Sequence, residues 1–215
     1  MNTVSDNNKI EFYKFLNGEK SIEDLENFIY SQPALEQQLG NETYLNLIEL
    51  NFKEKYDKVK LSDLITNKII EEGQFETWKL RRILNDFLNE PEKTDINLDK
   101  IYHLYCGVYQ ENGQRKYEFK FLGNLGLNYL YWTDKSYLKT NYGENWKAEY
   151  EKCSNEFEFY HEQLKDFAKE ILLAIEYKQI EVLNDGTYII SKDLKSKLET
   201  EQIYKLKHLD EKYGR

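Results

Sequence analysis

Hydrophobic residues recur at intervals of three and four along most of the chain. Ile22, Leu25, Phe28 and Ile29 fall on one helical face, and a longer run of this kind covers residues 155–177, about six helical turns. Because this spacing aligns apolar side chains on one side of a helix, it predicts a mainly α-helical chain. The segments with this pattern are 10–16, 21–31, 33–39, 44–50, 61–69, 80–88, 98–109, 155–177 and, with many charges, 192–213.

Capping residues mark several of the predicted helix ends. Ser21 with Asp24 three residues later resembles a capping box, in which the two residues satisfy free backbone N–H groups. Pro33 suits the first turn of the next helix, and Gly40 suits its end. Gly73 predicts a further helix end.

Two segments alternate in the manner of β-strands. Tyr117, Phe119 and Phe121 alternate with polar residues, and a turn at 122–126 leads to a returning strand at 127–132. A second hairpin spans 179–190, where an Asn-Asp-Gly turn separates QIEVL from TYII. The predicted fold is α-rich α+β, a helical domain with one or two small β-hairpins in its C-terminal half. Strands do not alternate with helices, which argues against a doubly wound sheet.

The best internal break lies at Pro91, within the polar segment NEPEKTDIN. It separates an N-terminal helical subdomain, residues 10–90, from a C-terminal α+β subdomain, residues 98–215. Residues 1–9 are polar and predict a disordered tail. One continuous domain stays the alternative, because the polar segment is short. Residues 134–151 fit a surface loop or a short helix.

The composition is that of a soluble globular protein. Of 215 residues, 40% are apolar and 32% charged, with 18 Tyr and 11 Phe. The N-terminus has no apolar signal-peptide core, and no apolar run approaches the ~20 residues of a membrane span. Cys106 and Cys153 are too few for a disulfide framework. We therefore predict a cytoplasmic protein with reduced thiols and no membrane partner.

The charge balance limits the class of partner. The net charge is −9 and the isoelectric point is about 5.1. Nucleic-acid binding needs concentrated Lys and Arg to contact phosphates, so no nucleic-acid partner is expected. An acidic chain instead attracts a basic protein.

Motifs for catalysis are scarce. The sequence contains no GxxxxGK[ST] loop and no GxSxG turn, and the pair Gly123 and Gly126 lacks the third glycine of a dinucleotide site. His103 and Cys106, three residues apart, share a helix face and resemble half of a zinc site. The other Cys and His residues have no paired spacing, which favours a packed Cys106 and a hydrogen-bonded His103. We therefore expect no metal, no cofactor and no catalytic residue.

Two alternatives to a simple binding protein stay open. A metal- or thiol-dependent hydrolase would use His103, Cys106 and nearby carboxylates. Glu156 and Glu158, in an aromatic run, could line a cleft, although a solvated helix face fits them better. A helical regulatory adaptor would use the face of 155–177, which would then stay exposed.

Trp78, Arg81 and Arg82 form an unusual group in an acidic chain. Tryptophan and arginine together can stack on and grip an anion. The stripe of Leu80 and Leu84 places the arginines off the apolar face, with acidic residues near enough to pair with them. We favour a structural clamp between helices over an anion site.

The N-terminal part resembles a known class of proteins. FYKFLNG, EQQLGNETYLNLIEL and the WKLRR helix, within residues 10–90, are similar to small bacterial proteins predicted to be immunity proteins of polymorphic or contact-dependent growth-inhibition toxin systems. The resemblance implies an acidic, cytoplasmic, non-enzymatic protein. Such a protein binds a cognate toxin, often a basic nuclease, and covers its active surface.

An aromatic and acidic stretch over 131–151 is our candidate for the partner-binding surface. It has no clean period and few aliphatic residues, while Tyr and Trp are frequent anchors of protein interfaces. The alternative is that these aromatics cover the long helix from outside. The candidate residues are Trp132, Tyr137, Tyr142, Glu144, Trp146, Glu149, Tyr150 and Glu151.

Overall fold

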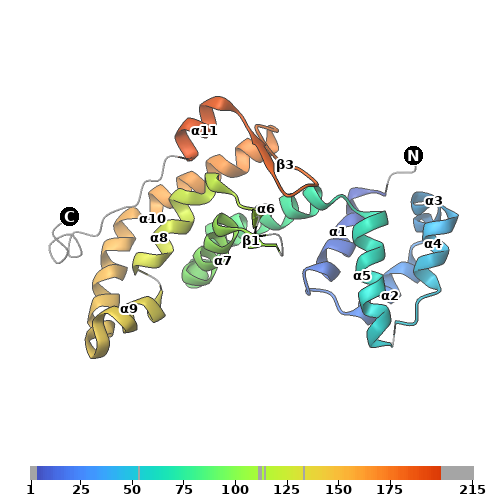
Figure 1. Cartoon of the computed structure of the whole chain (residues 1–215), viewed down its shortest axis with the longest axis horizontal. Helices are drawn as coiled ribbons and strands as arrows, with labels where there is room; N and C mark the ends of the chain where they lie inside the picture. Colours follow the sequence, from blue (N-terminus) through green and yellow to red (C-terminus); the bar gives the residue numbers. More distant parts are fainter. Residues whose placement is uncertain (1–3, 53, 111–112, 114, 133, 200–215) are drawn as a thin grey trace. The chain divides into compact units, whose positions relative to one another are not determined.

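The computed structural model describes residues 4–52, 54–110, 113, 115–132 and 134–199 (Figure 1). Within these residues the chain forms eleven α-helices and two two-stranded antiparallel sheets, so the predicted fold class is confirmed. Packing divides the chain into two compact units, Met1–Trp78 (unit 1) and Lys79–Arg215 (unit 2), and the break expected at Pro91 stays a prediction.

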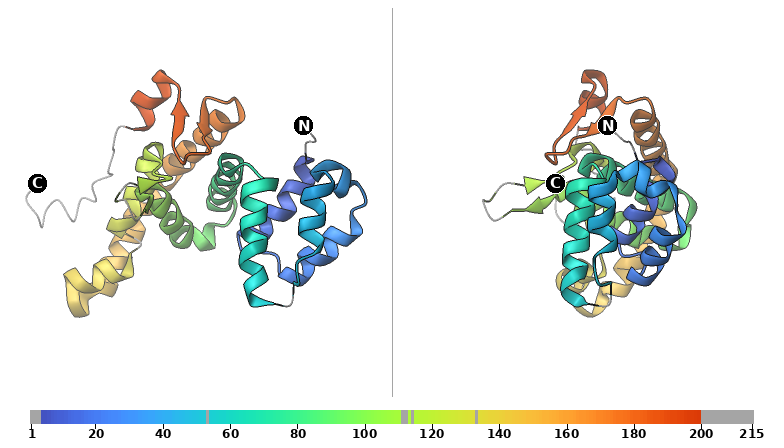
Figure 2. Two further views of the ribbon diagram at one scale, coloured as in Figure 1. Left: turned by 45° about the vertical axis from the view of Figure 1, so that its right-hand side comes forward. Right: turned by 90° about the vertical axis from the view of Figure 1, so that its right-hand side faces the viewer.

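Unit 1 is a group of short helices, coloured blue and teal in Figure 2. The predicted capping box at the start of α2 is present, because the backbone N–H of Asp24 donates to Ser21 Oγ over 3.0 Å. Unit 1 contains α1 (Asp6–Leu16), α2 (Ile22–Ser31), α3 (Ala34–Leu39), α4 (Asn41–Ile48), α5 (Lys55–Leu64), the π-helical turn η1 (Ile65–Ile69) and the start of α6 (Glu72–Asn89).

The core of unit 1 comes from the apolar stripes of these helices. Leu25, Ile29, Leu61 and Ile65, all at predicted stripe positions, are fully buried with Phe12. Each such side chain contributes about 1.5–3 kcal/mol on leaving water. The helical spacing therefore identified the buried face of α2 and α5 correctly.

Two predicted ends in unit 1 are wrong. Helix α1 begins at Asp6, so residues 6–9 of the expected tail are helical, and Asn8 and Lys9 are buried. Gln38 of α3 accepts hydrogen bonds from the Ser5 N–H and the Asn8 amide, which holds this end in place. Gly73 lies in the first turn of α6, because the chain leaves the helix earlier, at the extended residue Ile70.

Unit 2 consists of the rest of α6 and the elements that follow it. Its strand pairs are Val108↔Lys116 and Tyr109↔Arg115 in one sheet, and Ile180↔Ile190, Glu181↔Ile189 and Val182↔Tyr188 in the other. The elements are η2 (Pro91–Lys93), α7 (Thr94–Cys106), β1 (Val108–Tyr109), β2 (Arg115–Lys116), η3 (Lys120–Leu122), α8 (Gly123–Trp132), α9 (Lys135–Tyr142), η4 (Gly143–Asn145), α10 (Trp146–Glu176), β3 (Ile180–Val182), β4 (Tyr188–Ile190) and α11 (Lys192–Leu198).

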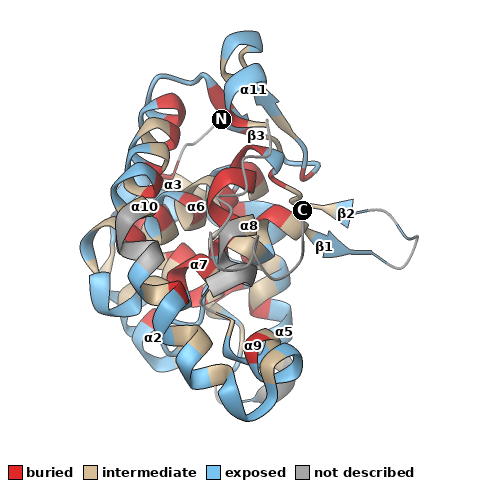
Figure 3. Ribbon diagram, turned by 90° about the vertical axis from the view of Figure 1, so that its left-hand side faces the viewer, coloured by how far each residue is buried: buried red, intermediate tan, exposed pale blue. Residues whose placement is uncertain are grey.

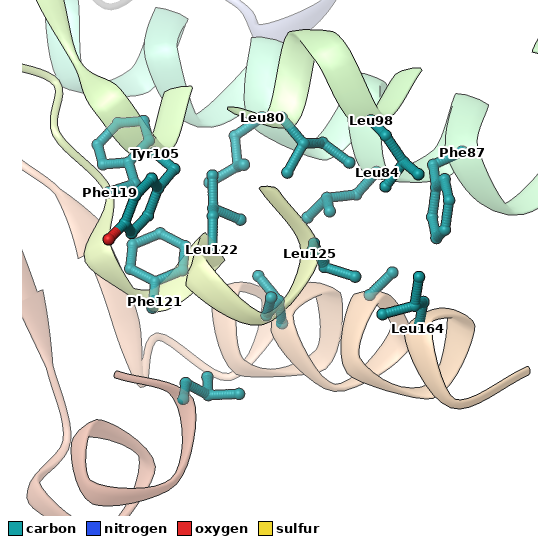
Figure 4. Close-up of a cluster of buried hydrophobic side chains, with 14 of the residues drawn as sticks. Leu80, Leu84, Phe87, Leu98, Tyr105, Phe119, Phe121, Leu122, Leu125 and Leu164 are labelled. Carbon is teal, nitrogen blue, oxygen red and sulfur yellow. The ribbon is translucent and has the colours of Figure 1, made fainter. Parts of the chain in front are cut away.

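The core of unit 2 lies between α6, α7, α8 and α10 (Figure 4). Leu80, Leu84 and Phe87, the predicted stripe of α6, are fully buried there. Leu125 of α8 and Leu164 of α10 face them in the same cluster. The stripe thus decides which side of α6 enters the core of unit 2.

The predicted hairpin over 117–132 is wrong. Phe119 and Phe121 are buried and stacked, with ring centroids 5.5 Å apart, but their partners lie far away in the sequence. The Tyr117 N–H donates to the Gly186 carbonyl over 2.9 Å, and the Phe119 N–H donates to the Leu104 carbonyl over 3.0 Å. Residues 123–132, which contain most of the expected turn and the expected returning strand at 127–132, form α8.

The first sheet uses residues that we assigned to a helix. Helix α7 ends at Cys106, because Gly107 has a φ of 69°, and the chain continues as β1. In Figure 3 β1 and β2 form a small projecting ribbon, on which Val108 and Tyr109 are exposed.

The second predicted hairpin is confirmed as β3 and β4. Its turn contains Gly186, whose φ of 82° is a conformation that glycine adopts without strain. Asp185 Oδ1 accepts hydrogen bonds from the backbone N–H and the hydroxyl of Thr187, over 2.9 and 2.6 Å. The Asn-Asp-Gly turn therefore forms locally, as its sequence predicts.

Candidate functional site

The candidate surface over 131–151 is mostly helical. Asp134 caps α9 by accepting the backbone N–H groups of Ser136 and Tyr137, over 2.8 and 3.0 Å. Gly143, with a φ of 53°, ends that helix, and α10 begins at Trp146. Of the surface loop or short helix predicted over 134–151, the structure has a short helix, α9, followed by η4 and the start of α10.

The aromatic residues of this surface are half-buried. Tyr137, Tyr142, Trp146 and Tyr150 pack against the core of unit 2. Trp132 is the last residue of α8, and its side chain lies outside the described part. These four aromatics pack against the core, and Trp146 and Tyr150 belong to the long helix α10 itself. Their role in binding a partner stays a prediction.

Lysine side chains lie over two of these rings. The Lys139 ammonium is 4.8 Å from the Trp146 ring centroid, and the Lys135 ammonium is 5.2 Å from that of Tyr150. Glu144 and Glu151 are exposed, while Lys152 donates to the half-buried Glu149 over 3.0 Å.

The charges of this surface nearly cancel. Residues 131–151 contain four acidic and three basic residues, so they supply little net attraction for a basic partner. They are Asp134, Glu144, Glu149 and Glu151, and Lys135, Lys139 and Lys147.

Trp78 packs within unit 1. Its ring lies 5.7 Å from that of Tyr13 and 6.2 Å from that of Phe75, and burial raises the pKa of Tyr13 to about 12. Arg81 and Arg82, on the unit 2 part of α6, are both exposed. The clamp stays a prediction, with Trp78 in a packed aromatic cluster and the arginines at the surface.

The residues of the hydrolase alternative do not form a metal centre. His103 is exposed, with Nε2 3.5 Å from Asp99 Oδ1, and Cys106 is half-buried. A hydrogen bond with Cys106 raises the pKa of Tyr102. Across the described part of the chain, no three His, Cys, Asp or Glu residues lie close enough together to hold a metal ion. The side chains of Glu156 and Glu158 fall outside the described part.

The helical face of the adaptor alternative is largely buried where its side chains are described, and Phe157 lies outside the described part. Leu164, Ala168 and Ile171 of α10 lie in the core of unit 2. Leu173 and Tyr177, near the end of α10, are exposed, but they do not belong to that face. An adaptor that needs this face exposed would have to separate α10 from the rest of the unit 2 core.

The division into units reveals an uneven distribution of charge. Residues 1–78 contain 15 Asp and Glu but 8 Lys and Arg, so unit 1 carries −7 of the chain's −9. Residues 21–52 contain six acidic residues and no Lys or Arg. This gap in Lys and Arg is visible in the sequence itself, but the net charge of the whole chain does not reveal it.

The acidic residues of α2 and α4 face solvent. Glu42 and Glu49 are exposed on either side of Leu45, which is 41% exposed on the same face. On α2, Glu23 is exposed, and Tyr30 two turns later is 57% exposed. Each helix thus combines acidic groups with one accessible apolar side chain.

Comparisons with protein-family models, curated proteins and solved structures found no match to this chain. Among the described residues, no helix is both long enough and apolar enough to cross a membrane.

Proposed function

We propose that the protein is a non-enzymatic, cytoplasmic binding protein of the immunity type, which neutralises a cognate toxin by covering its active surface. The observation that supports the proposal is the charge of unit 1, which has exposed acidic groups and no Lys or Arg over 21–52. A basic protein such as a nuclease presents cations for phosphate contacts, and acidic side chains can occupy the same positions.

The acidic surface would act mainly on the rate of association. Opposite charges steer two proteins together and raise the association rate by roughly 10- to 1,000-fold at low salt. Exposed Tyr30 and Leu45 would add apolar contacts within that surface. A fast capture suits a protein that has to bind a toxin before the toxin acts.

The first test is capture of the partner with the tagged full-length chain from its own host, followed by co-expression. We expect one basic protein that stops growth when produced alone and is harmless when produced with this chain. A captured protein that is harmless alone, or turnover of a substrate by the purified chain, would contradict the proposal.

The second test locates the surface with two matched triple variants. We expect Glu23→Lys, Glu42→Lys and Glu49→Lys in unit 1 to lower the association rate at least tenfold at low salt, because they reverse exposed charges. Glu144→Lys, Glu151→Lys and Glu176→Lys in unit 2 change the net charge equally and should have a much smaller effect. The opposite ranking, measured by stopped-flow kinetics, would place the partner on the surface of α9 and α10.

A further inference from the structure

Helix α11 is attached to the rest of unit 2 mainly at its C-terminal end. Lys197 contacts α10, Glu199 contacts β4, and Leu198 enters the core. Figure 1 shows α11 at the edge of unit 2, directly after β4. Most of the earlier residues of α11 are exposed, namely Lys192, Asp193, Lys195 and Ser196. Three consecutive residues thus provide most of the docking contacts of this helix.

The apolar contact of α11 is small. Leu198 is 1% exposed, and Leu194, one turn earlier, is half-buried against the core. The helix lies against η3, the turn that contains Phe121. Because apolar burial stabilises in proportion to area, α11 is held much less strongly than α10. The buried residues that α10 contributes to the same core include Cys153, Leu164, Ala168, Ile171, Ala174 and Ile175.

Two polar contacts hold the same end of α11. The Tyr188 hydroxyl donates to Glu199 Oε1 over 2.7 Å, and burial together with this hydrogen bond raises the pKa of Tyr188. Lys197 Nζ donates to Glu170 Oε1 over 2.6 Å, but the Lys197 side chain is 58% exposed. An ion pair this exposed contributes little to stability and is screened by salt. The hydrogen bond from Tyr188 is therefore the more important of the two contacts.

Helix α11 is too short to be stably helical without its docking contacts. It has seven residues, and Ser191 at its N-cap makes no side-chain capping hydrogen bond. Isolated helices shorter than ~12–15 residues are marginal in water. Docking and helix formation are therefore coupled, so that loss of the contacts at 197–199 unfolds the whole of α11.

We infer that α11 undocks and unfolds as one unit while the rest of unit 2 stays folded. The preceding hairpin does not need α11, because β3 pairs with β4 and the Ser191 N–H donates to the Gln179 carbonyl over 3.0 Å. Undocking exposes the Tyr188 side chain and the side of η3 against which α11 lies. Helix α11 is thus a removable cover of this aromatic surface. The inference does not depend on the proposed function.

Hydrogen exchange of the full-length chain, measured by mass spectrometry, tests the inference. The backbone amides of 193–199 should exchange at least 100-fold faster than those of 164–175 in α10, and at least tenfold more slowly than in an unfolded chain. Rates equal to those of α10 would overturn the inference, because α11 would then open only when unit 2 unfolds. Rates equal to those of an unfolded chain would also overturn it, because α11 would then have no docked state.

A matched pair of variants tests whether the contacts at 197–199 control the opening. Tyr188→Phe removes the hydroxyl and keeps the ring, so exchange of 193–199 should become at least fivefold faster while that of 164–175 changes less than twofold. Lys165→Gln breaks an ion pair with Glu162 within α10 and should leave 193–199 unchanged. Equal acceleration of both segments by Tyr188→Phe would show that the hydroxyl stabilises unit 2 as a whole, contrary to the inference.

A third variant, Leu198→Asp, produces the undocked form. A carboxylate without a partner is strongly disfavoured in an apolar core, so α11 should stay undocked. The amides of 193–199 should then lose their protection, while those of 164–175 keep theirs within threefold. Loss of protection in both segments, together with loss of helical circular dichroism, would mean that unit 2 cannot fold without α11 and would contradict the inference.

Discussion

Asn97 is fully buried in α7, and neither polar atom of its side-chain amide has a hydrogen-bond partner in the described part of the chain. A buried amide without partners costs about 1–3 kcal/mol relative to one that stays in water. The neighbouring residues Leu98 and Ile101 belong to the core of unit 2. Asn97 therefore occupies a position that an apolar side chain of similar size would suit better.

We predict that Asn97→Leu raises the free energy of unfolding by about 1–2 kcal/mol, because it removes an unpaired amide from the core. Urea denaturation followed by circular dichroism measures the change. Asn141→Leu, at an exposed position of α9, is the control and should change stability by less than about 0.5 kcal/mol. A loss of stability in Asn97→Leu would mean that the amide has a partner in solution.

At the scale of elements, α8 packs closely against α7. Gly126 of α8 lies against α7 so tightly that a Cβ atom there would meet Tyr102 Cα at 3.0 Å and Tyr105 Cβ at 3.2 Å. Glycine normally weakens a helix by about 1 kcal/mol relative to alanine. Here its missing side chain allows the two backbones to approach.

We predict that Gly126→Ala destabilises the protein by about 1–3 kcal/mol, because the new methyl group meets backbone atoms that cannot rotate away. Chemical denaturation measures whether the free energy of unfolding falls or rises. A gain of about 1 kcal/mol, the ordinary effect of alanine in a helix, would show that α8 can move away from α7 without cost.

The difference between local and distant contacts explains why one hairpin was predicted correctly and the other was not. The turn of β3 and β4 is set by Asp185 and Gly186, whose hydrogen bonds and φ angle are local. The segment around Phe119 is not a strand, because Tyr117 has a φ of 56° and residues 120–122 form the 3-10 helix η3. Contacts with Tyr188 and Leu104 hold Phe119 in place. Contacts with residues so distant in the sequence do not affect the local alternation of apolar and polar residues, so the alternation cannot predict them.

At the scale of the whole molecule, several carboxylates are stabilised by nearby donors. The pKa of Glu11 is lowered by hydrogen bonds from Lys14 and Lys20, and that of Glu118 by Lys120 and Arg115. A carboxylate with a lowered pKa in the folded state contributes stability above its unfolded pKa, near 4.5. That contribution is lost as the pH falls below this value, when the folded carboxylates take up protons.

We predict that the free energy of unfolding falls between pH 6 and pH 3. The double variant Glu11→Gln and Glu118→Gln should show a shallower fall, since two of the titrating groups are gone. Urea denaturation at each pH measures how steeply the free energy of unfolding changes with pH. Glu144→Gln with Glu151→Gln, at exposed positions of α10 and the turn before it, is the control. An unchanged slope in the first pair would assign the acid sensitivity to other carboxylates.

The charge distribution also belongs to this scale. The sequence contains every charge, but the division at Trp78 and Lys79 decides that most of the excess negative charge lies in one unit. The nearly neutral surface over 131–151 and the acidic surface of unit 1 are therefore different candidates for a partner. The matched triple variants distinguish them.

The sequence by itself determined the helical class, the buried stripes of α2 and α6, the capping box at Ser21 and the Asp-Gly hairpin. Each of these depends on residues within one or two turns of each other, so their periodicity or local hydrogen bonding is sufficient. Tertiary structure alone decided that Trp78 packs on Tyr13 and that residues 123–132 form a helix against α7. It also placed the Lys20 ammonium against Glu11 and the Phe28 ring. These features depend on contacts between segments that are not adjacent in the sequence, whose pairing is set by the packing of the complete core.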